Sequence, residues 1–328
     1  MCRIIFSCQA DFQGAALQEL LGACVRLTFV KWLDGGVGLL EYAGDFAGLS
    51  GLLREMRPVF TRHIFPAEHT GAYSGRLMQD FAARMDKAKA FSVQARAAGN
   101  NSCKPAEIRQ KAADYLKSGG FAENKRYPEQ VISLFGAGDI IYAGLSLAEQ
   151  NLSIWSGGMR HYALKADTVS RAGFKLMEAL EAYPLDFEAG SSALDLGAAP
   201  GGWTKVLLER GLRVTAVDPV QLSPALQADR RVEYHSVRAH DYIRQSGKIF
   251  DLIVNDMSMN IFSSINFVLA LKKRLRAGGH VIITFKLTKH DRLNKINEGL
   301  ALLRGAFEPV FVKQLFHNRS EITVILTH

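Results

Sequence analysis

Hydrophobic positions in the first 58 residues switch between the two-residue period of strands and the wider period of helices. The predicted elements are strands at 3–8, 25–32 and 37–42 and helices at 15–24 and 45–56. The turn signal Asp34-Gly35-Gly36 separates the second and third strands. This order, strand, helix, strand, strand, helix, is typical of a ferredoxin-like α+β unit, which we expect over residues 1–58.

A second pattern covers residues 59–165. The predicted elements are helices at 76–89 and 104–117 and strands at 91–97, 130–135 and 140–146. The last two strands flank Gly136-Ala137-Gly138-Asp139, which predicts a hairpin.

From residue 166 to 328, strands and helices alternate. The predicted strands are 193–196, 213–217, 251–255, 280–285, 310–314 and 321–326, with helices at 203–209, 261–275 and 294–303. Such alternation favours an α/β domain with a doubly wound, mostly parallel sheet. The closing strand pair is compatible with an antiparallel edge.

Composition and charge narrow the class of protein. A chain of 328 residues that is 48% hydrophobic and 22% charged is globular, with two domains or three small ones. Its net charge of +8 modestly favours a polyanionic partner. No apolar run is long enough for a membrane span, and the first residues lack the features of a signal peptide.

Cysteine usage fits a reducing compartment, and we expect a cytoplasmic location. No two of the four cysteines have CxxC spacing, so neither a disulfide framework nor a zinc site is expected. No other metal cluster is visible, and no obligatory protein partner is evident. The cysteines are Cys2, Cys8, Cys24 and Cys103.

The segment ALDLGAAPGGWTK, residues 193–205, carries the clearest chemical signal. A buried strand ends near Asp195, runs into a loop with three glycines, and opens a helix. A second strand ends at Asp218, where an acid can accept both hydroxyls of a ribose. A nicotinamide dinucleotide site would instead show GxGxxG facing a pyrophosphate, which Asp195 would repel. Two acids suit S-adenosylmethionine, which carries an ammonium and a sulfonium.

The motif LDLGAAPGGWT resembles the methyl-donor loop of the FtsJ-type ribose methyltransferases, and the likeness extends over residues 167–328. It implies a Rossmann-like methyltransferase fold with the donor at the carboxyl ends of the strands. In many such enzymes an acid after the next strand contacts the adenine amine, and the nearest one here is Asp241. The expected donor-binding residues are Asp195, Gly197, Ala198, Ala199, Pro200, Gly201, Gly202, Trp203, Asp218, Asp241 and Asp256.

FtsJ-type enzymes share a Lys-Asp-Lys-Glu set, and the resemblance implies that this chain supplies it from four separate segments. The matching residues are Lys175 in SRAGFKL, Asp256 after LIVN, Lys286 after VIITF and Glu321 in SEITVIL. A ribose hydroxyl needs a base at its proton and an in-line methyl sulfonium. We expect Lys286 to be that base. The second lysine and partial desolvation would lower its pKa, and the two carboxylates would raise it, so the sequence leaves the direction of the net shift open. Asp256 and Glu321 would orient the lysines, and Lys175 would contact the hydroxyl or a phosphate.

Other methyl acceptors fit less well. Exocyclic amine methylation uses an [Asn/Asp]-Pro-Pro-aromatic loop, whereas the run here is Asn255-Asp256-Met257-Ser258. Methylation of pyrimidine carbon 5 uses a cysteine nucleophile, and every cysteine precedes this domain.

Residues 59–165 resemble a THUMP domain, an RNA-binding module, on the segments KPAEIRQKAADYL and PEQVISLFGAGDIIYAGLSL. Phosphate-contact candidates are Arg84, Lys87, Lys89, Lys104, Arg109, Lys111, Lys117, Lys125, Arg126, Arg160 and His161. Tyr127 and Trp155 are candidates for base stacking, although core packing is the safer expectation for both.

The order of the three units resembles a family of bacterial cytidine 2′-O-methyltransferases of 23S rRNA, and that resemblance implies the same substrate. Two alternatives remain open at this point. One is the same chemistry on tRNA, because THUMP-like modules often serve tRNA enzymes. The other is a non-catalytic RNA-binding or assembly factor, against which the complete Lys-Asp-Lys-Glu set argues.

Overall fold

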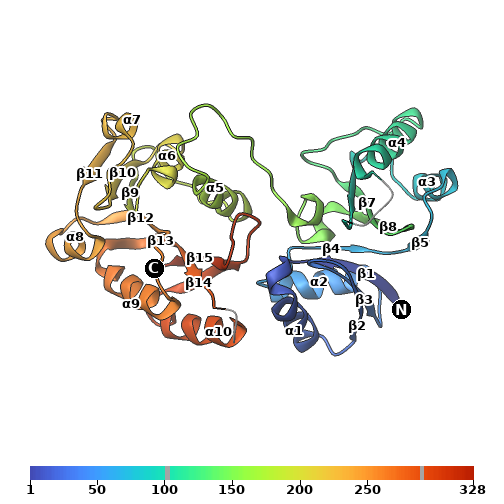
Figure 1. Cartoon of the computed structure of the whole chain (residues 1–328), viewed down its shortest axis with the longest axis horizontal. Coiled ribbons are helices and arrows are strands. Elements are labelled where there is room, and N and C mark those ends of the chain that lie inside the picture. The colour runs from blue at the N-terminus through green and yellow to red at the C-terminus, as the bar shows by residue number, and fades with distance from the viewer. Residues whose placement is uncertain (100–103, 289–291) are drawn as a thin grey trace. The chain divides into compact units, whose positions relative to one another are not determined.

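The computed structural model describes residues 1–99, 104–288 and 292–328. The chain forms two compact units, Met1–Arg160 and His161–His328, which are described separately (Figure 1). Cys103 lies outside the described ranges. No helix within these ranges is long and apolar enough to cross a membrane.

The first unit begins with a four-stranded antiparallel sheet of order β2-β3-β1-β4. Its elements are β1 Cys2–Ser7, α1 Gln13–Ala23, β2 Leu27–Asp34, β3 Val37–Tyr42, α2 Phe46–Met56 and β4 His63–Pro66. The predicted ferredoxin-like order is present, and Asp45 caps α2 by accepting from the Gly48 N–H at 2.7 Å. The fourth strand, β4, belongs to this sheet because it pairs with β1, although it lies beyond the expected boundary at residue 58.

A second four-stranded sheet in the same unit has the order β5-β8-β7-β6. Its elements are β5 His69–Gly71, α3 Gly75–Ala82, β6 Phe91–Ala97, α4 Pro105–Ser118, β7 Gln130–Ala137 and β8 Ile140–Leu147. Ile5 and Phe65 of the first sheet join Phe135 and Tyr142 of the second in one buried cluster. The two sheets therefore share a core.

The helix predicted at 76–89 is wrong beyond Ala82. The cause is the buried Gln130 side chain, which binds the backbone of the following loop. Its Oε1 accepts from the Asp86 N–H, and its Nε2 donates to the carbonyl oxygens of Asp86 and Lys89. These bonds satisfy backbone groups that a continuing helix would otherwise pair internally.

The second unit contains a seven-stranded sheet of order β11-β10-β9-β12-β13-β15-β14. Its strands are β9 Ser192–Leu196, β10 Arg213–Val217, β11 Val232–His235, β12 Phe250–Asn255, β13 Leu275–Lys286, β14 Glu308–Lys313 and β15 Glu321–Thr327. The first five strands of that order run parallel, and β15 lies antiparallel between β13 and β14. The α/β fold with a closing antiparallel pair is thus confirmed.

Helices cover both faces of this sheet: α5 and α6 lie on one side, and α9 and α10 on the other (Figure 1). The helices are α5 Gly173–Ala182, α6 Gly202–Glu209, α7 Pro224–Gln227, α8 Ala239–Gln245, α9 Ile261–Leu271 and α10 Arg292–Leu303. The helix predicted at 261–275 ends at Leu271, since Leu275 already pairs with Phe250 as the start of β13. This arrangement brings the carboxyl ends of β9, β10 and β12 to one edge, the usual ligand position in such sheets.

Candidate active site

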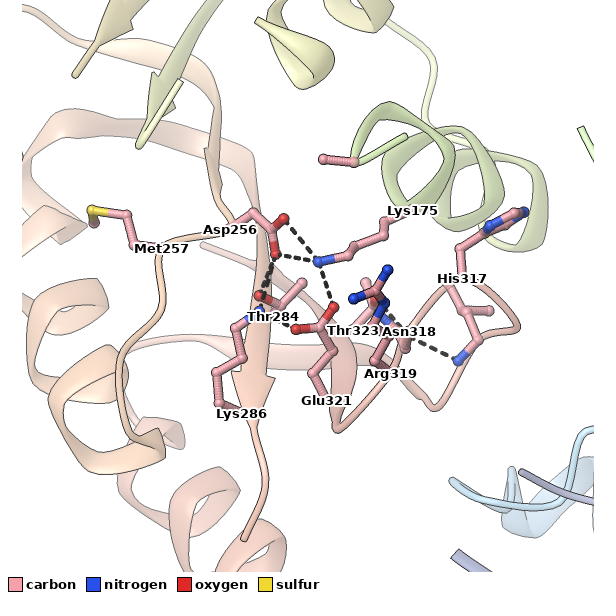
Figure 2. Close-up of polar contacts among 12 residues, drawn as sticks. Lys175, Asp256, Met257, Thr284, Lys286, His317, Asn318, Arg319, Glu321 and Thr323 are labelled. Atoms are coloured by element: carbon pink, nitrogen blue, oxygen red, sulfur yellow. Dashed lines mark hydrogen bonds and ion pairs between the residues drawn. The ribbon is translucent and has the colours of Figure 1, made fainter. Parts of the chain in front are cut away.

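The structure brings Lys175, Asp256, Lys286 and Glu321 together in one cluster, hereafter the tetrad (Figure 2). Lys175 comes from α5, Asp256 directly follows β12, Lys286 ends β13 and Glu321 begins β15. Because β13 and β15 are antiparallel, Lys286 and Glu321 are register partners. Directly opposite residues have their Cβ atoms about 5 Å apart, so their side chains meet.

Ion pairs connect all four members of the tetrad. Lys175 Nζ lies 2.9 Å from Asp256 Oδ2 and 2.5 Å from Glu321 Oε1. Lys286 Nζ contacts Glu321 Oε2 and lies 3.6 Å from Asp256 Oδ1. Each carboxylate therefore faces both lysines, and the four charges sum to zero when all are ionised.

The two lysines differ in their surroundings. The Lys175 side chain is 15% exposed and that of Lys286 is 28% exposed. Burial lowers the pKa of Lys175, but Asp256 and Glu321 outweigh it, and the net pKa is raised. Burial likewise raises the pKa of Glu321, yet its two lysine partners bring the net pKa below the usual value. Lys175 and Glu321 thus form a persistently charged pair, whereas Lys286 is more accessible to an incoming substrate.

Thr284 belongs to the same cluster and was missed in the sequence. Its Oγ1 donates to Asp256 Oδ1 at 2.7 Å, and the residue is 1% exposed. Thr284 lies two positions before Lys286 on β13, so both side chains are on one face of the strand. That spacing was the signal that could have revealed it.

Asp195 lies in β9, beneath the glycine-rich loop, and is 1% exposed. Thr204 Oγ1 donates to Asp195 Oδ2 at 2.6 Å. Burial raises the pKa of Asp195 to about 7, and the nearby carboxylates of Asp256 and Asp218 add to the effect. A buried acid of this kind is ionised most easily when a cation binds beside it.

Positive φ angles at two glycines shape the loop itself. Gly197 has φ +74°, and a Cβ there would lie 2.5 Å from Met257 Cγ. Gly201 has φ +115°, and a Cβ there would lie 2.1 Å from Leu226 Cδ1. Both positions therefore require glycine for conformation and for space.

The start of α6 also positions α5, the helix that carries Lys175. A Cβ on Gly173 would lie 2.9 Å from the Gly202 carbonyl oxygen, so the two helices touch through glycines. Trp203 Nε1 donates to the Ala172 carbonyl oxygen at 2.9 Å. The glycine-rich loop and the tetrad are therefore joined by direct packing.

The remaining predicted donor residues are placed around this loop. Asp218 follows β10, and its carboxylate accepts from the N–H groups of Ala199 at 3.1 Å and Val220 at 2.8 Å. Ala198 is buried, and a cis peptide bond joins Ala199 to Pro200. Asp241 lies in the first turn of α8, with a half-exposed side chain 3.9 Å from Arg244.

Residues 314–320, which connect β14 to β15, form a second loop beside the tetrad; we refer to it as the connecting loop (Figure 2). The Glu178 carboxylate on α5, 6% exposed, accepts from the N–H groups of Phe316 and His317, both at 2.8 Å. Asn318 is 2% exposed, and its Oδ1 accepts from the Leu315 N–H at 2.8 Å and from Thr323 Oγ1 at 3.1 Å. Sequence reasoning missed Glu178, although it lies three residues after Lys175, on the same helix face.

In the first unit, many of the predicted phosphate-contact residues are paired with local acids. Arg84 binds Glu68 through two hydrogen bonds of 3.0 and 2.7 Å, and Arg109 lies 3.3 Å from Glu123. Lys104, Lys117 and Lys125 pair with Glu107, Asp114 and Glu123, respectively, at 3.1, 2.7 and 3.9 Å. The positive surface of this unit is weaker than the sequence indicated.

The expectation of core packing is wrong for Tyr127, which is 63% exposed. Asn124 Oδ1 accepts from the N–H groups of Arg126 and Tyr127 and so forms a tight turn. The turn directs the ring outward, with the Arg126 guanidinium 5.2 Å from its centroid. Trp155 is half-buried, and its ring lies 4.2 Å from the Arg160 guanidinium.

Residues 168–315 match the family model described as FtsJ-like methyltransferase. The matched range includes the glycine-rich loop, Lys175, Asp256 and Lys286, and it ends shortly before Glu321. These residues of the second unit are therefore similar to FtsJ-like methyltransferases, and the unit has a Rossmann-like fold.

The curated relatives carry a more specific name. "Ribosomal RNA large subunit methyltransferase M" of Azotobacter vinelandii is 31% identical over 222 residues, 63% of this chain and 61% of that protein. The protein of the same name from Azoarcus sp. is 33% identical over 188 residues, 53% of this chain and 50% of that protein. The chain thus spans between 50% and 61% of the length of these two relatives. A solved structure, TrmN from Thermus thermophilus, covers 100% of this chain at 14% identity, with a TM-score of 0.39.

Proposed function

We propose that this chain is an S-adenosylmethionine-dependent RNA methyltransferase that modifies a ribose 2′-oxygen, with a cytidine of 23S rRNA as its substrate. The observation that carries the proposal is the tetrad, in which both lysines and both carboxylates converge beside the glycine-rich loop. The named relatives support rRNA as the substrate class. An rRNA substrate also implies a cytoplasmic location.

The residues around the glycine-rich loop fit the methyl donor. S-adenosylmethionine supplies an electrophilic methyl group on a sulfonium and carries an ammonium. Asp195, whose pKa is raised to about 7 by burial, would hold the ammonium. Asp218, at the end of the neighbouring strand, would accept from the ribose hydroxyls of the donor. The backbone of 197–202 would line the contact, and its path depends on the positive φ angles of Gly197 and Gly201.

Lys286 is the residue assigned to remove the proton from the 2′-hydroxyl. It has the more exposed side chain of the two lysines and lies at the end of β13. Lys175, whose pKa is raised by its carboxylate partners, would remain an ammonium and orient the attacking oxygen. Asp256 and Glu321 would hold both amines in place, which supplies positioning rather than proton transfer.

The first unit is assigned to RNA delivery. Its support is the exposed Tyr127 beside Arg126, an arrangement suited to stacking on an unpaired base. Lys104, Arg109 and Lys117 are paired with acids, which reduces their charge available to phosphates, so stacking on Tyr127 would contribute alongside phosphate contacts.

The test uses purified protein, methyl-labelled S-adenosylmethionine, and unmethylated 23S rRNA and tRNA transcripts in separate reactions. Digestion to nucleosides and mass spectrometry identify the labelled product, which we expect to be 2′-O-methylcytidine from 23S rRNA. Label found only on tRNA would change the substrate and keep the chemistry. Label on a base atom would contradict the role of the tetrad.

Two variants separate proton removal from charge. Lys286→Arg keeps a positive charge but cannot lose its proton near neutral pH, so it should be as inactive as Lys286→Ala. Exposed Lys273 on the same unit supplies the matched control, and Lys273→Ala should retain full activity. Activity of Lys286→Arg close to that of the unmodified protein would show that Lys286 is not the base.

A further inference from the structure

The tetrad alone provides no net attraction for RNA, because its two ammonium groups are balanced by two carboxylates. A ribose that reaches Lys286 nevertheless carries phosphodiesters, and its 3′-phosphate is attached one ring carbon away from the 2′-oxygen. A positive side chain outside the tetrad would supply the attraction for that phosphate. The connecting loop supplies one in Arg319, two residues before Glu321.

Arg319 is exposed, although the backbone that carries it is firmly held. The fully buried Gln314 donates through Nε2 to the carbonyl oxygens of Asn318 and Arg319, at 3.2 and 3.3 Å. Buried side chains that bond the backbone in this way fix a local conformation. The Arg319 backbone position is thus set by the protein interior, while its guanidinium is left at the surface.

The loop is anchored on both sides of Arg319 to elements of the tetrad. Glu178 ties Phe316 and His317 to α5, the helix of Lys175. On the other side, the Leu287 N–H donates to the Ser320 carbonyl oxygen at 2.8 Å, directly after Lys286. Arg319 therefore lies at the rim of the tetrad, beside Glu321 and on the side away from Lys286 (Figure 2).

Arg319 also differs from the two lysines of the tetrad in its ion pairs. In the described part of the chain, the ion pairs at this site join the tetrad members with one another, and none includes Arg319. A guanidinium offers a planar pair of donors that matches two phosphate oxygens.

We propose that Arg319 binds the phosphate on the 3′ side of the reacting ribose and so sets the acceptor nucleotide in register with Lys286. This inference rests on the proposed function, since it requires an RNA ribose at the tetrad. It assigns to the connecting loop a binding role separate from proton removal.

The experiment measures methyl transfer to a 23S rRNA transcript by the full chain over a range of salt concentrations. Arg319→Ala should raise KM about tenfold with little change in kcat, because a charge-assisted contact to substrate is lost. It should also reduce the slope of log affinity against log salt by about one. Arg319→Lys keeps the positive charge but lacks the paired guanidinium donors, so its KM should lie between those of the unmodified enzyme and Arg319→Ala. Arg304→Ala, at another exposed arginine of this unit, should change neither quantity.

A synthetic RNA locates the phosphate once the labelled nucleotide is known. Replacing its 3′-phosphate with a neutral methylphosphonate should raise KM for the unmodified enzyme and leave the Arg319→Ala variant unaffected. Equal responses of both enzymes, or identical behaviour of Arg319→Ala and Arg304→Ala, would overturn the inference and leave the function intact. Failure of the unmodified enzyme to methylate any ribose would instead overturn the proposed function, and this inference with it.

Discussion

Two loops border the tetrad, and their conformations are held by different means. The glycine-rich loop after β9 depends on backbone freedom, with φ +74° at Gly197 and φ +115° at Gly201. The connecting loop before β15 depends instead on buried polar side chains, namely Gln314, Asn318 and the distant Glu178.

The difference follows from what each loop is proposed to contact. A small ligand that lies on the backbone requires the absence of side chains, and glycine provides it. A loop that presents a side chain to a polymer needs its backbone fixed from beneath, which buried hydrogen bonds provide. Substitutions that remove one support while sparing the other test this comparison.

The largest effect is expected for Glu178→Ala. Two hydrogen bonds to a buried carboxylate are lost, so the free energy of unfolding of the second unit should fall by about 3 kcal/mol in urea denaturation. Methyl transfer should fall sharply, while the Kd for S-adenosylmethionine should stay unchanged, since the glycine-rich loop is intact. The control is Glu188→Ala, at an exposed position. A weakened donor Kd would show that the two loops are not independent.

Gly201→Ala should cost about 2 kcal/mol of unfolding free energy, from a φ of +115° and a Cβ 2.1 Å from Leu226 Cδ1. The donor Kd should weaken as well, as measured by calorimetry. Gly211→Ala is the matched control, because its φ is +84° and a Cβ there meets nothing within 4 Å. Equal effects at both glycines would mean that backbone strain alone, rather than crowding, explains the loss.

Asp195 makes donor binding depend on pH. Its pKa is about 7 in the folded chain against an ordinary value of 3.8, so between these values the folded state holds the extra proton. In that window, Asp195 makes the unfolding free energy fall as pH rises. Binding of the donor ammonium requires the ionised carboxylate, so Kd should tighten up to about tenfold per pH unit from about pH 5.5 to 7 and then level off. Asp195→Asn should bind weakly with a flat profile, and a sloping profile would assign the titration to another group.

The smallest effect is expected for Trp203→Phe, which keeps an aromatic ring but removes the N–H that donates to Ala172. The free energy of unfolding, measured by urea denaturation, should fall by about 1 kcal/mol. The kcat should fall more than the donor Kd changes, because Ala172 precedes the helix of Lys175. A variant with normal kcat would show that this bond does not position Lys175.

The two loops also explain what could be predicted from the sequence. Glycines at fixed spacing after a strand are a local pattern. The ends of the strands that lead to Asp256 and Lys286 could be located from the alternation of predicted strands and helices. Glu178 binds the backbone N–H groups of Phe316 and His317, which lie 138 and 139 positions further along the chain. Every residue type except proline has such an N–H group, so the sequence does not reveal these partners. The turn that exposes Tyr127 has a local cause, Asn124, and its three-residue spacing could have been recognised.

The bounds of some helices and strands could likewise be predicted from the sequence, whereas those of others could not. The strands at 213–217 and 91–97 have the predicted bounds, and in 91–97 hydrophobic and polar residues alternate as in a strand. The helix predicted at 76–89 was too long because the buried side chain of Gln130, far along the chain, hydrogen-bonds to the backbone of the loop that follows Ala82. The insertion of β15 between β13 and β14 depends on strand pairing, which hydrophobic periodicity does not encode.

That insertion has a consequence for which positions beside the tetrad can be substituted. The pairing of Lys286 with Glu321 is written into the register of two antiparallel strands, and a slip of one residue would turn Glu321 to the opposite face. The register is held along the whole ladder, from His280 and Thr327 to Lys286 and Glu321. Residues 314–320 precede that ladder, so a substitution of an exposed side chain there, such as Arg319, leaves the pairing of Lys286 with Glu321 unchanged.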